Sequence, residues 1–244
     1  MNLAPVARRS VVDGAYEQLA AEILDGRLVP GEVLPAERTL TELLGVNRQA
    51  VREALQRLAQ DGLVAIQHGG ATRVRAFRQS GALHLLPRLV LSADGKVDRG
   101  VIRSVIEMRL AIGPDVARLA AQRARPEHLA RVAEAAAVLD DRSVPAVRRS
   151  HVNLDLWDAL VDASDNIAYR FAYNSLRASF EPVAGFVADY LTSELDDVKG
   201  RRRLLAAVSD GKPEAAEAAA RKLLAASSAA LTALLAQLPE GFVK

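Results

Sequence analysis

Apolar residues recur at helical spacing along the first part of the chain. In residues 10–26, tyrosine, leucine and isoleucine side chains lie three or four positions apart, which predicts a first helix. A second helix is predicted to begin near Pro35, because proline is tolerated in a first helical turn, and to bury Leu40, Leu43 and Leu44. The chain therefore opens with two short amphipathic helices.

A third helix is predicted directly after a tight turn. Gly45 suits the position that ends the second helix, because glycine adopts a positive φ at little cost. Asn47 is a suitable N-cap, since its side-chain oxygen can accept a hydrogen bond from a free backbone N–H. Val51, Leu55 and Leu58 form the inward stripe of the next helix. The pattern is typical of a helix-turn-helix.

A short hairpin is predicted after the third helix. Val64 and Ile66 alternate with polar residues, and residues 72–74 do the same beyond a glycine-containing tip at 68–71. Three helices followed by a two-stranded wing make residues 1–78 a winged helix-turn-helix domain.

The rest of the chain is predicted to be helical. Residues 79–100 are rich in turn-forming residues around a short apolar run, which indicates a linker with a short helix. The helices predicted in residues 101–244 are Val101–Ile112, Asp115–Ala124, Pro126–Asp140, Val147–Ala163, Ile167–Leu191, Asp196–Val208 and Pro213–Leu238. Pro182 is expected to kink the fifth of them. The predicted fold class is mostly α, with an N-terminal winged helix-turn-helix followed by an all-α helical bundle.

Composition supports a helical, soluble protein. Half of the 244 residues are hydrophobic and a quarter are charged, whereas aromatic residues make up only 4%. The absence of cysteine excludes disulfides, thiolate metal sites and a cysteine nucleophile. No apolar run of signal-peptide length follows the N-terminus, and none approaches the roughly 18 residues of a membrane span. We therefore expect a cytoplasmic protein without a membrane partner.

Net charge alone does not indicate a nucleic-acid partner. The formal net charge is +2, and residues 1–78 contain ten lysines and arginines against nine aspartates and glutamates. Affinity for DNA would therefore depend on a few well-placed side chains rather than on a basic domain.

Three polar side chains on the third helix form a candidate DNA-reading surface. Arg48, Gln49 and Arg52 project from one side near the start of that helix. Arginine suits the guanine edge in the major groove, and glutamine suits the adenine edge. An ordinary solvated helix face is the alternative, but the tight turn before the helix and the wing after it favour DNA recognition.

Further candidate contacts flank this helix. Arg38 could contact a phosphate or form a salt bridge with Glu42 four residues later. Asn47 could cap the third helix and also donate to a phosphate. At the wing tip, His68 could reach the minor groove or a phosphate, and Gly69 would let the backbone approach closely, although a hairpin tip favours glycine in any case.

These residues carry a resemblance to a known family. The segments concerned are Pro35–Arg38, Leu43–Arg48, Val51–Gly62 and Ile66–Gly69. They resemble the GntR family of bacterial transcription regulators, and within it the FadR branch, whose C-terminal domain is an all-α effector sensor. The resemblance is dense over about residues 12–80 and looser to the C-terminus.

The resemblance implies a set of DNA-contacting positions. In this chain they hold Arg38, Asn47, Arg48, Gln49, Arg52, His68 and Gly69. Two departures stand out, because Gln49-Ala50 replaces small hydroxyl residues and Gly70 replaces a basic residue. The family's mode of docking on DNA is therefore expected to carry over more safely than its target sequence.

The resemblance also raises the question of a metal, since many relatives with this fold bind one through an aspartate and three histidines. At the Asp-x-x-x-His position this chain has Asn153 and Trp157. The later histidine positions hold Arg201 or Arg202 and Leu223. We interpret the run Arg201-Arg202-Arg203 as a solvated face, and a clamp for the phosphates of CoA is the alternative. We therefore expect neither a metal nor another cofactor.

Three residues of the second domain are candidate effector contacts. Arg109 lies in an otherwise apolar helix and needs a partner, either Asp155 or Asp158 or an anionic ligand. By resemblance, Arg109 and Ser227 fall on acyl-CoA-contacting positions. Trp157 favours a lipid-like effector, although core packing would also explain a tryptophan there.

The sequence thus predicts a transcription regulator that binds double-stranded operator DNA as a homodimer at a pseudo-palindrome. The resemblance makes an acyl-CoA or a fatty acid the expected effector, and a different carboxylate metabolite is the alternative. A helical enzyme with a DNA-binding head is disfavoured, because no nucleophile–base grouping or Gly-rich phosphate loop is present. A non-specific architectural protein would bind scrambled DNA equally well.

Overall fold

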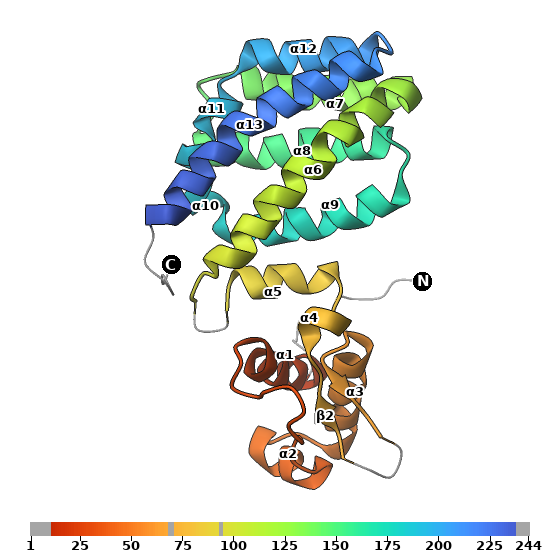
Figure 1. Cartoon of the computed structure of the whole chain (residues 1–244), viewed down its shortest axis with the longest axis vertical. Coiled ribbons are helices and arrows are strands. Elements are labelled where there is room, and N and C mark those ends of the chain that lie inside the picture. Colours follow the sequence, from red (N-terminus) through yellow and green to blue (C-terminus); the bar gives the residue numbers. More distant parts are fainter. Residues whose placement is uncertain (1–10, 68–70, 93–94, 238–244) are drawn as a thin grey trace, which may run out of the picture. The chain divides into compact units, whose positions relative to one another are not determined.

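The computed structural model of the chain describes residues 11–67, 71–92 and 95–237, and it divides into two compact units, residues 1–94 and 95–244 (Figure 1). The elements of the first unit are α1 (Val11–Leu24), α2 (Glu37–Leu44), α3 (Arg48–Gln60), β1 (Val64–Ala65), β2 (Arg73–Val74), α4 (Phe77–Ser80), η1 (Leu83–Leu85) and α5 (Leu86–Val90). The mostly helical fold class, with a helix-turn-helix followed by a helical unit, is confirmed.

The core of the first unit lies between α1 and α3. Ile23 of α1 and Leu58 of α3 are fully buried, and Leu40 joins them from α2. The prediction that Leu43 is buried is wrong, since 70% of its surface is exposed. Leu43 and Leu44 lie on opposite sides of Leu40 around the helix axis, and the core is on the side of Leu44.

Two glycines and a cap shape the helix-turn-helix and the wing. Gly45 ends α2 at a φ of 63°, and the Asn47 side chain accepts a hydrogen bond from the backbone N–H of Ala50 at 2.9 Å, as predicted. Gly62 follows α3 at a φ of 76° and leads into β1, which pairs antiparallel with β2. The wing tip at residues 68–70 lies outside the described residues.

The second unit is a bundle of helices. Its elements are α6 (Arg99–Arg123), α7 (Pro126–Asp140), α8 (Ala146–Ala163), α9 (Ile167–Phe180), η2 (Glu181–Val183), α10 (Ala184–Val187), η3 (Ala188–Leu191), α11 (Thr192–Leu195), α12 (Val198–Ser209) and α13 (Pro213–Gln237). Two expectations were wrong. A single helix, α6, runs through Pro114 where two were predicted. At Pro182 the helix does not kink but ends at Phe180, because proline lacks the N–H that would continue it, and short turns follow.

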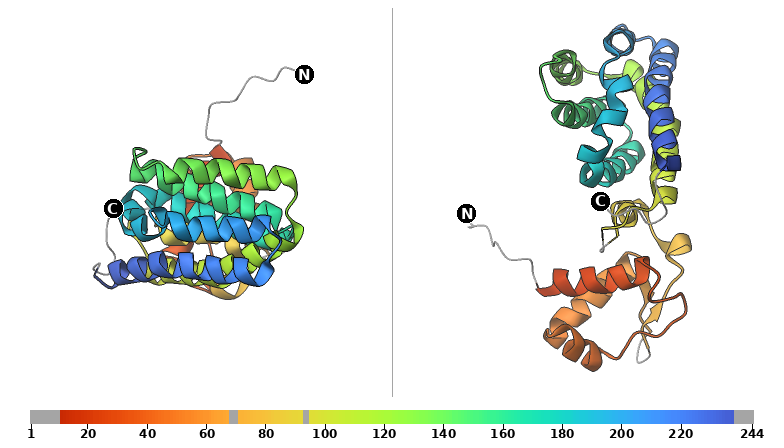
Figure 2. Two further views of the ribbon diagram at one scale, coloured as in Figure 1. Left: turned by 90° about the horizontal axis from the view of Figure 1, so that it is seen from above. Right: turned by 90° about the vertical axis from the view of Figure 1, so that its left-hand side faces the viewer.

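Helices α6 and α13 run antiparallel along each other (Figure 2). Arg99 donates to the carbonyl oxygen of Leu235, and Gly113 lies opposite Leu224 further along. A Cβ atom at Gly113 would come within 2.4 Å of the Leu224 side chain, so glycine permits this close approach. By length and composition α13 could cross a membrane, but its buried face packs against α6 and α12, as in the core helix of a globular domain.

Replacing Gly62 by alanine should destabilise the first unit far more than replacing Gly45. Both glycines have a positive φ, which costs an alanine about 1–2 kcal/mol. At Gly62 the new Cβ would also lie 2.2 Å from the backbone oxygen of Ser80, whereas nothing lies within 4 Å at Gly45. We expect a loss of about 3 kcal/mol or more for Gly62→Ala.

The measurement is urea unfolding of the full chain, followed by far-UV circular dichroism. Fluorescence of Trp157, the single tryptophan, reports the second unit separately. Equal losses for Gly62→Ala and Gly45→Ala would contradict the contact with Ser80.

Candidate nucleic-acid interface and candidate effector site

The candidate DNA-reading side chains lie together on the exposed face of α3. Arg48, Gln49 and Arg52 are all exposed, while Val51 and Leu55 of the same helix are buried in the core. The turn at Gly45 and the cap at Asn47 therefore present the start of α3 to solvent, as the spacing predicted.

Two of these three side chains are held by carboxylates. The Arg52 Nε lies 2.9 Å from a Glu37 carboxylate oxygen, and the Gln49 amide donates to Glu53 at 2.7 Å. Arg48 makes no ion pair or hydrogen bond with any residue that the structure describes. Such exposed pairs contribute at most about 1 kcal/mol, so they can be exchanged for a phosphate or a base.

Arg38 and Asn47 lie at the two ends of the turn region. The Arg38 Nε lies 3.2 Å from Glu42, so the salt bridge weighed from the sequence is formed. The Arg38 side chain nevertheless remains 83% exposed. Asn47 uses its oxygen for the cap, and its amide N–H groups make no hydrogen bond within the described part of the chain.

A groove runs between α3, the residues before α2 and the base of the wing. Its volume is about 760 Å³, and Arg52, Gln56, Gln67 and Thr72 contribute polar side chains to its wall. His68 and Gly69, the candidate contacts of the wing tip, lie outside the described residues.

A second polar site lies inside the helical unit, around Glu194 of α11. Its carboxylate accepts hydrogen bonds from Arg109 Nη2 at 2.6 Å, from Asn153 Nδ2 at 2.9 Å and from Trp157 Nε1 at 3.3 Å. The Ser227 hydroxyl donates to the other carboxylate oxygen and accepts from Arg109. The three candidate effector residues, predicted separately, therefore meet at one carboxylate.

The partner of Arg109 differs from the two proposed from the sequence. It is Glu194, whereas Asp155 and Asp158 pair with arginines of α7 and α9. Nor are the surroundings of Trp157 purely apolar, because its indole N–H points at the same carboxylate. Sequence reasoning missed Glu194, because the segment after Pro182 also holds Asp189, Asp196 and Asp197, and nothing local distinguishes Glu194 from them.

Glu194 is ionised at neutral pH although it is 1% exposed. Burial raises the pKa of this carboxyl group, but Arg109 and the hydrogen bonds from Ser227 and Asn153 outweigh burial and hold the pKa below its ordinary value of 4.5. The Arg109 side chain keeps 25% of its surface exposed. The site is therefore a buried ion pair that reaches the surface through arginine.

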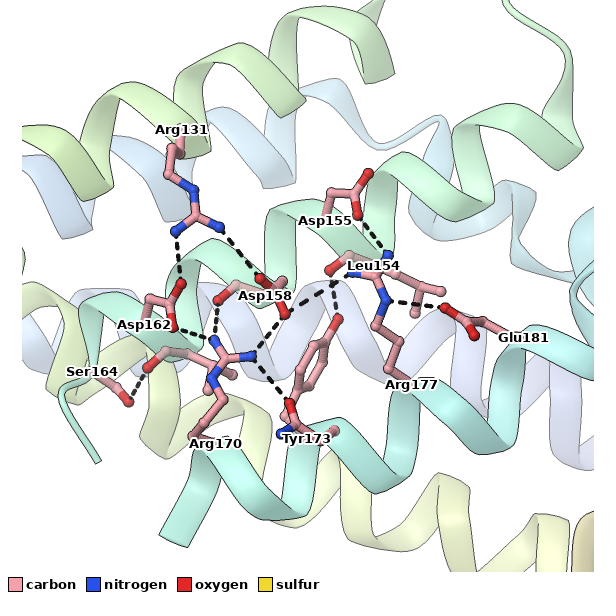
Figure 3. Close-up of polar contacts among 12 residues, drawn as sticks. Arg131, Leu154, Asp155, Asp158, Asp162, Ser164, Arg170, Tyr173, Arg177 and Glu181 are labelled. Carbon is pink, nitrogen blue, oxygen red and sulfur yellow. Dashed lines mark hydrogen bonds and ion pairs between the residues drawn. The ribbon is translucent and has the colours of Figure 1, made fainter. Parts of the chain in front are cut away.

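The opposite face of α8 is fixed by a network of ion pairs (Figure 3). Arg170 of α9 bonds Asp158 at 2.7 Å and Asp162 at 2.6 Å, and Arg131 of α7 bonds Asp162 at 2.7 Å. Burial raises the pKa of Asp162, but the two arginines bring it below its ordinary value. Because Trp157 precedes Asp158 on the same helix, these pairs also fix the position of the indole.

Arg201 holds the backbone on which Glu194 lies. Its guanidinium bonds Asp140 at 2.6 Å and the carbonyl oxygens of Glu194 and Leu195 at 3.4 and 3.2 Å. Arg201 is 1% exposed, so the interpretation of the run 201–203 as a solvated face is wrong for its first residue. Arg201 faces inward from α12, while Arg202 remains exposed beside Asp140.

Within the described residues, no group of three or more histidine, aspartate or glutamate side chains is placed to hold a metal ion. Asn153 and Trp157, which stand where metal-binding relatives are expected to have aspartate and histidine, act as hydrogen-bond donors to Glu194. The chemistry of this site is that of anion binding.

Comparison with known proteins gives matches to both units. Residues 12–74 match the family model described as "Bacterial regulatory proteins, gntR family", and residues 104–226 match the FCD domain. The chain is 43% identical to the HTH-type transcriptional regulator Mce2R of Mycobacterium tuberculosis, over 96% of this chain and 97% of that protein.

Two further similarities extend the comparison. The chain is 33% identical to the fatty acid metabolism regulator protein of Yersinia pestis, over 70% of each chain. The structure of Lar, which controls expression of the Listeria monocytogenes agr system, aligns with a TM-score of 0.53 at 17% identity, over 98% of this chain and 100% of that chain. The latter likeness concerns the fold alone.

The contribution of Glu194 to stability should be lost only in acid. Its pKa is lower in the folded chain than its ordinary 4.5, so the stabilisation is fully present above that pH and disappears as the pH falls through the lower folded-state pKa. At neutral pH we expect Glu194→Gln to lose about 3 kcal/mol, the lower end for a broken buried pair, because Arg109 is a quarter exposed.

The measurement is the difference in free energy of unfolding between the wild type and Glu194→Gln as a function of pH. The other carboxylates are present in both proteins, so their contributions cancel in this difference. The difference should stay constant between pH 7 and 5 and shrink below about 4.5. A difference that already declines between pH 7 and 5 would contradict the lowered pKa.

Proposed function

The chain belongs to the gntR family of bacterial regulatory proteins, with an FCD domain as its C-terminal part, and on that premise we propose that it binds a pseudo-palindromic operator as a homodimer under the control of a small effector. It is a transcription regulator, as its relatives and its fold indicate. The proposal includes a cytoplasmic location, which action on operator DNA requires. The observation that carries the proposal is the exposed start of α3, where Arg48 has no partner among the residues that the structure describes.

In the proposed complex α3 lies in the major groove. Arg48, Gln49 and Arg52 reach base edges or phosphates from the start of the helix, where a recognition helix makes its base contacts. Arg38 and Asn47 flank this surface and can bind the phosphate backbone. By family resemblance, His68 and Gly69 of the wing add contacts beside it.

Carboxylates limit the attraction of this surface for DNA in general. Glu37, Glu42 and Glu53 each hold one of the candidate contacts in the free protein. Binding DNA replaces these weak pairs by contacts with phosphates or bases, while Arg48 is available at once. This arrangement favours discrimination between sequences over non-specific affinity.

The effector site proposed for the second unit is the network around Glu194. Three candidate effector residues meet there, namely Arg109, Trp157 and Ser227. Arg109 and Ser227 fall on acyl-CoA-contacting positions by family resemblance, and Trp157 suits a lipid-like effector. The fatty acid metabolism regulators among the relatives support a fatty acid or an acyl-CoA as effector. The charged character of the network also favours a different carboxylate metabolite, which is the second candidate.

Substitution of Arg48 should weaken binding to operator DNA more than it weakens binding to unrelated DNA. Arginine paired with a guanine edge contributes about 1–3 kcal/mol of discrimination, so Arg48→Ala should lose roughly 5- to 150-fold in specific affinity for each half-site. Arg38→Ala is the matched control on α2. It should weaken binding to all DNA sequences alike, and it should reduce the dependence of the DNA-binding constant on salt concentration by the equivalent of about one phosphate contact.

Gel-shift titration measures both variants against DNA from upstream of the protein's own gene and against scrambled DNA of the same length. If Arg48→Ala kept the wild-type ratio between the two DNAs, α3 would not be the recognition helix. Equal affinity of the wild type for both DNAs would indicate an architectural DNA-binding protein instead.

A fatty acid or an acyl-CoA at micromolar concentration should cause the protein to release its operator DNA. Laurate and lauroyl-CoA test the two forms, and succinate and lactate test small carboxylates. Because an effector shifts the equilibrium only by its differential affinity for the two states, release should saturate with binding. Quenching of Trp157 fluorescence, followed in parallel, reports binding in the second unit. Release by the small acids alone would favour the metabolite alternative.

A further inference from the structure

The site around Glu194 has the composition of a carboxylate-binding site. Three elements contribute its donors, since Arg109 lies on α6, Asn153 and Trp157 on α8, and Ser227 on α13. A guanidinium, an amide, an indole and a hydroxyl together satisfy both oxygens of one carboxylate. The same set would bind the carboxylate of a small ligand equally well.

The group that fills this site belongs to the chain itself, and it lies on the weakest element nearby. The donors are carried by the long helices α6, α8 and α13, which have 25, 18 and 25 residues. Glu194 is on α11, a helix of only four residues. From Glu181 to Leu195 no helix is longer than four residues. The donor geometry is therefore rigid, and the occupant is the part that can move.

Access to the site is through Arg109. This side chain is 25% exposed, while Glu194 is 1% exposed. An anion arriving from solvent would meet the guanidinium first and would then compete for Asn153, Trp157 and Ser227. Glu194 would have to leave, because two carboxylates sharing these donors repel each other.

We propose that Glu194 is a built-in competitor of the effector, and that the effector is a carboxylate anion which takes over Arg109 and its neighbouring donors by displacing Glu194. This rests on the proposed function, namely that the second unit binds an effector. With the effector class of the proposed function, the anion is a free fatty acid, whose head group replaces the Glu194 carboxylate.

The displaced segment is connected to the rest of the bundle. Arg201 of α12 holds the carbonyl oxygens of Glu194 and Leu195 as well as Asp140 of α7, and Arg149 of α8 bonds Asp196 at 2.6 Å. Movement of α11 therefore changes contacts with α12 and α8, and through Arg201 it also affects the contact with α7. Binding of a small anion is thereby coupled to the arrangement of the bundle.

The first experiment removes the Glu194 carboxylate by mutation and supplies a free carboxylate in its place. Glu194→Ala removes a group of the size of acetate, so acetate should bind the vacated site, raise the melting temperature by about 2–4 °C and return Trp157 fluorescence towards the wild-type value. Acetamide, the neutral isostere, and chloride at equal ionic strength should do neither. If Glu194→Ala folds only with acetate present, recovery of folded protein is the same test.

The double variant Arg109→Met with Glu194→Ala is the matched control, and it should show no response to acetate. An acetate effect that persists in the double variant, or that acetamide and chloride reproduce, would overturn the proposal. Either result would mean that Glu194 does not fill a site for anions.

The second experiment measures competition directly. Laurate should bind Glu194→Gln at least about 10-fold more tightly than the wild type, because a neutral amide holds Arg109 less strongly. Dodecanol, which has no charge, should not distinguish the two proteins, and lauroyl-CoA shows whether phosphates can serve in place of a carboxylate. Measurable laurate binding with equal affinity for the two proteins would overturn the proposal.

The two experiments separate this inference from the proposed effector. If acetate rescues Glu194→Ala while laurate and lauroyl-CoA bind neither protein, the anion site stands and the fatty-acid effector falls. If laurate binds both proteins equally and acetate rescues nothing, the fatty-acid effector stands and the role of Glu194 as competitor falls.

Discussion

The helical unit depends on one buried charge, that of Glu194. A carboxylate in this position would be prohibitively costly without Arg109 and three further donors, so α6, α8 and α13 must approach α11 closely enough to supply them. Gly113 permits part of this approach, since a Cβ there would clash with Leu224 of α13. Packing and electrostatics are therefore satisfied by the same arrangement of helices.

The two units use ion pairs in opposite ways. On the helix-turn-helix the pairs Arg38–Glu42 and Arg52–Glu37 are exposed, and their small contribution to stability makes them easy to exchange for DNA. In the helical unit the Glu194 carboxylate of the Arg109–Glu194 pair is withdrawn from water, so any exchange requires a chemically equivalent partner. Exposed pairs suit binding to a polyanion, whereas the buried pair suits selection of one kind of ligand.

Around the buried pair, further arginines fix the helices that carry it. Arg170 and Arg131 tie α8 to α9 and α7 through Asp158 and Asp162, and Arg201 ties α11 to α12. These contacts explain how a short turn with little helical stability of its own holds a charged side chain in one place. They also connect the proposed effector site to most of the bundle.

Local rules were sufficient for the turn and the helix cap of the first unit. Helix spacing, the positive φ of Gly45 and the cap at Asn47 are properties of neighbouring residues, and the structure has them as predicted. Tertiary structure alone decided the partner of Arg109, the burial of Arg201 and the exposure of Leu43. Glu194 lies 85 residues from Arg109 in the chain, and no periodicity relates two positions that meet only when three helices pack. The sequence by itself determined the candidate residues and most of the elements, apart from the helix that runs through Pro114 and the helix that ends before Pro182. Packing determined which side chains meet, because a buried charge selects its partner by proximity in the folded chain.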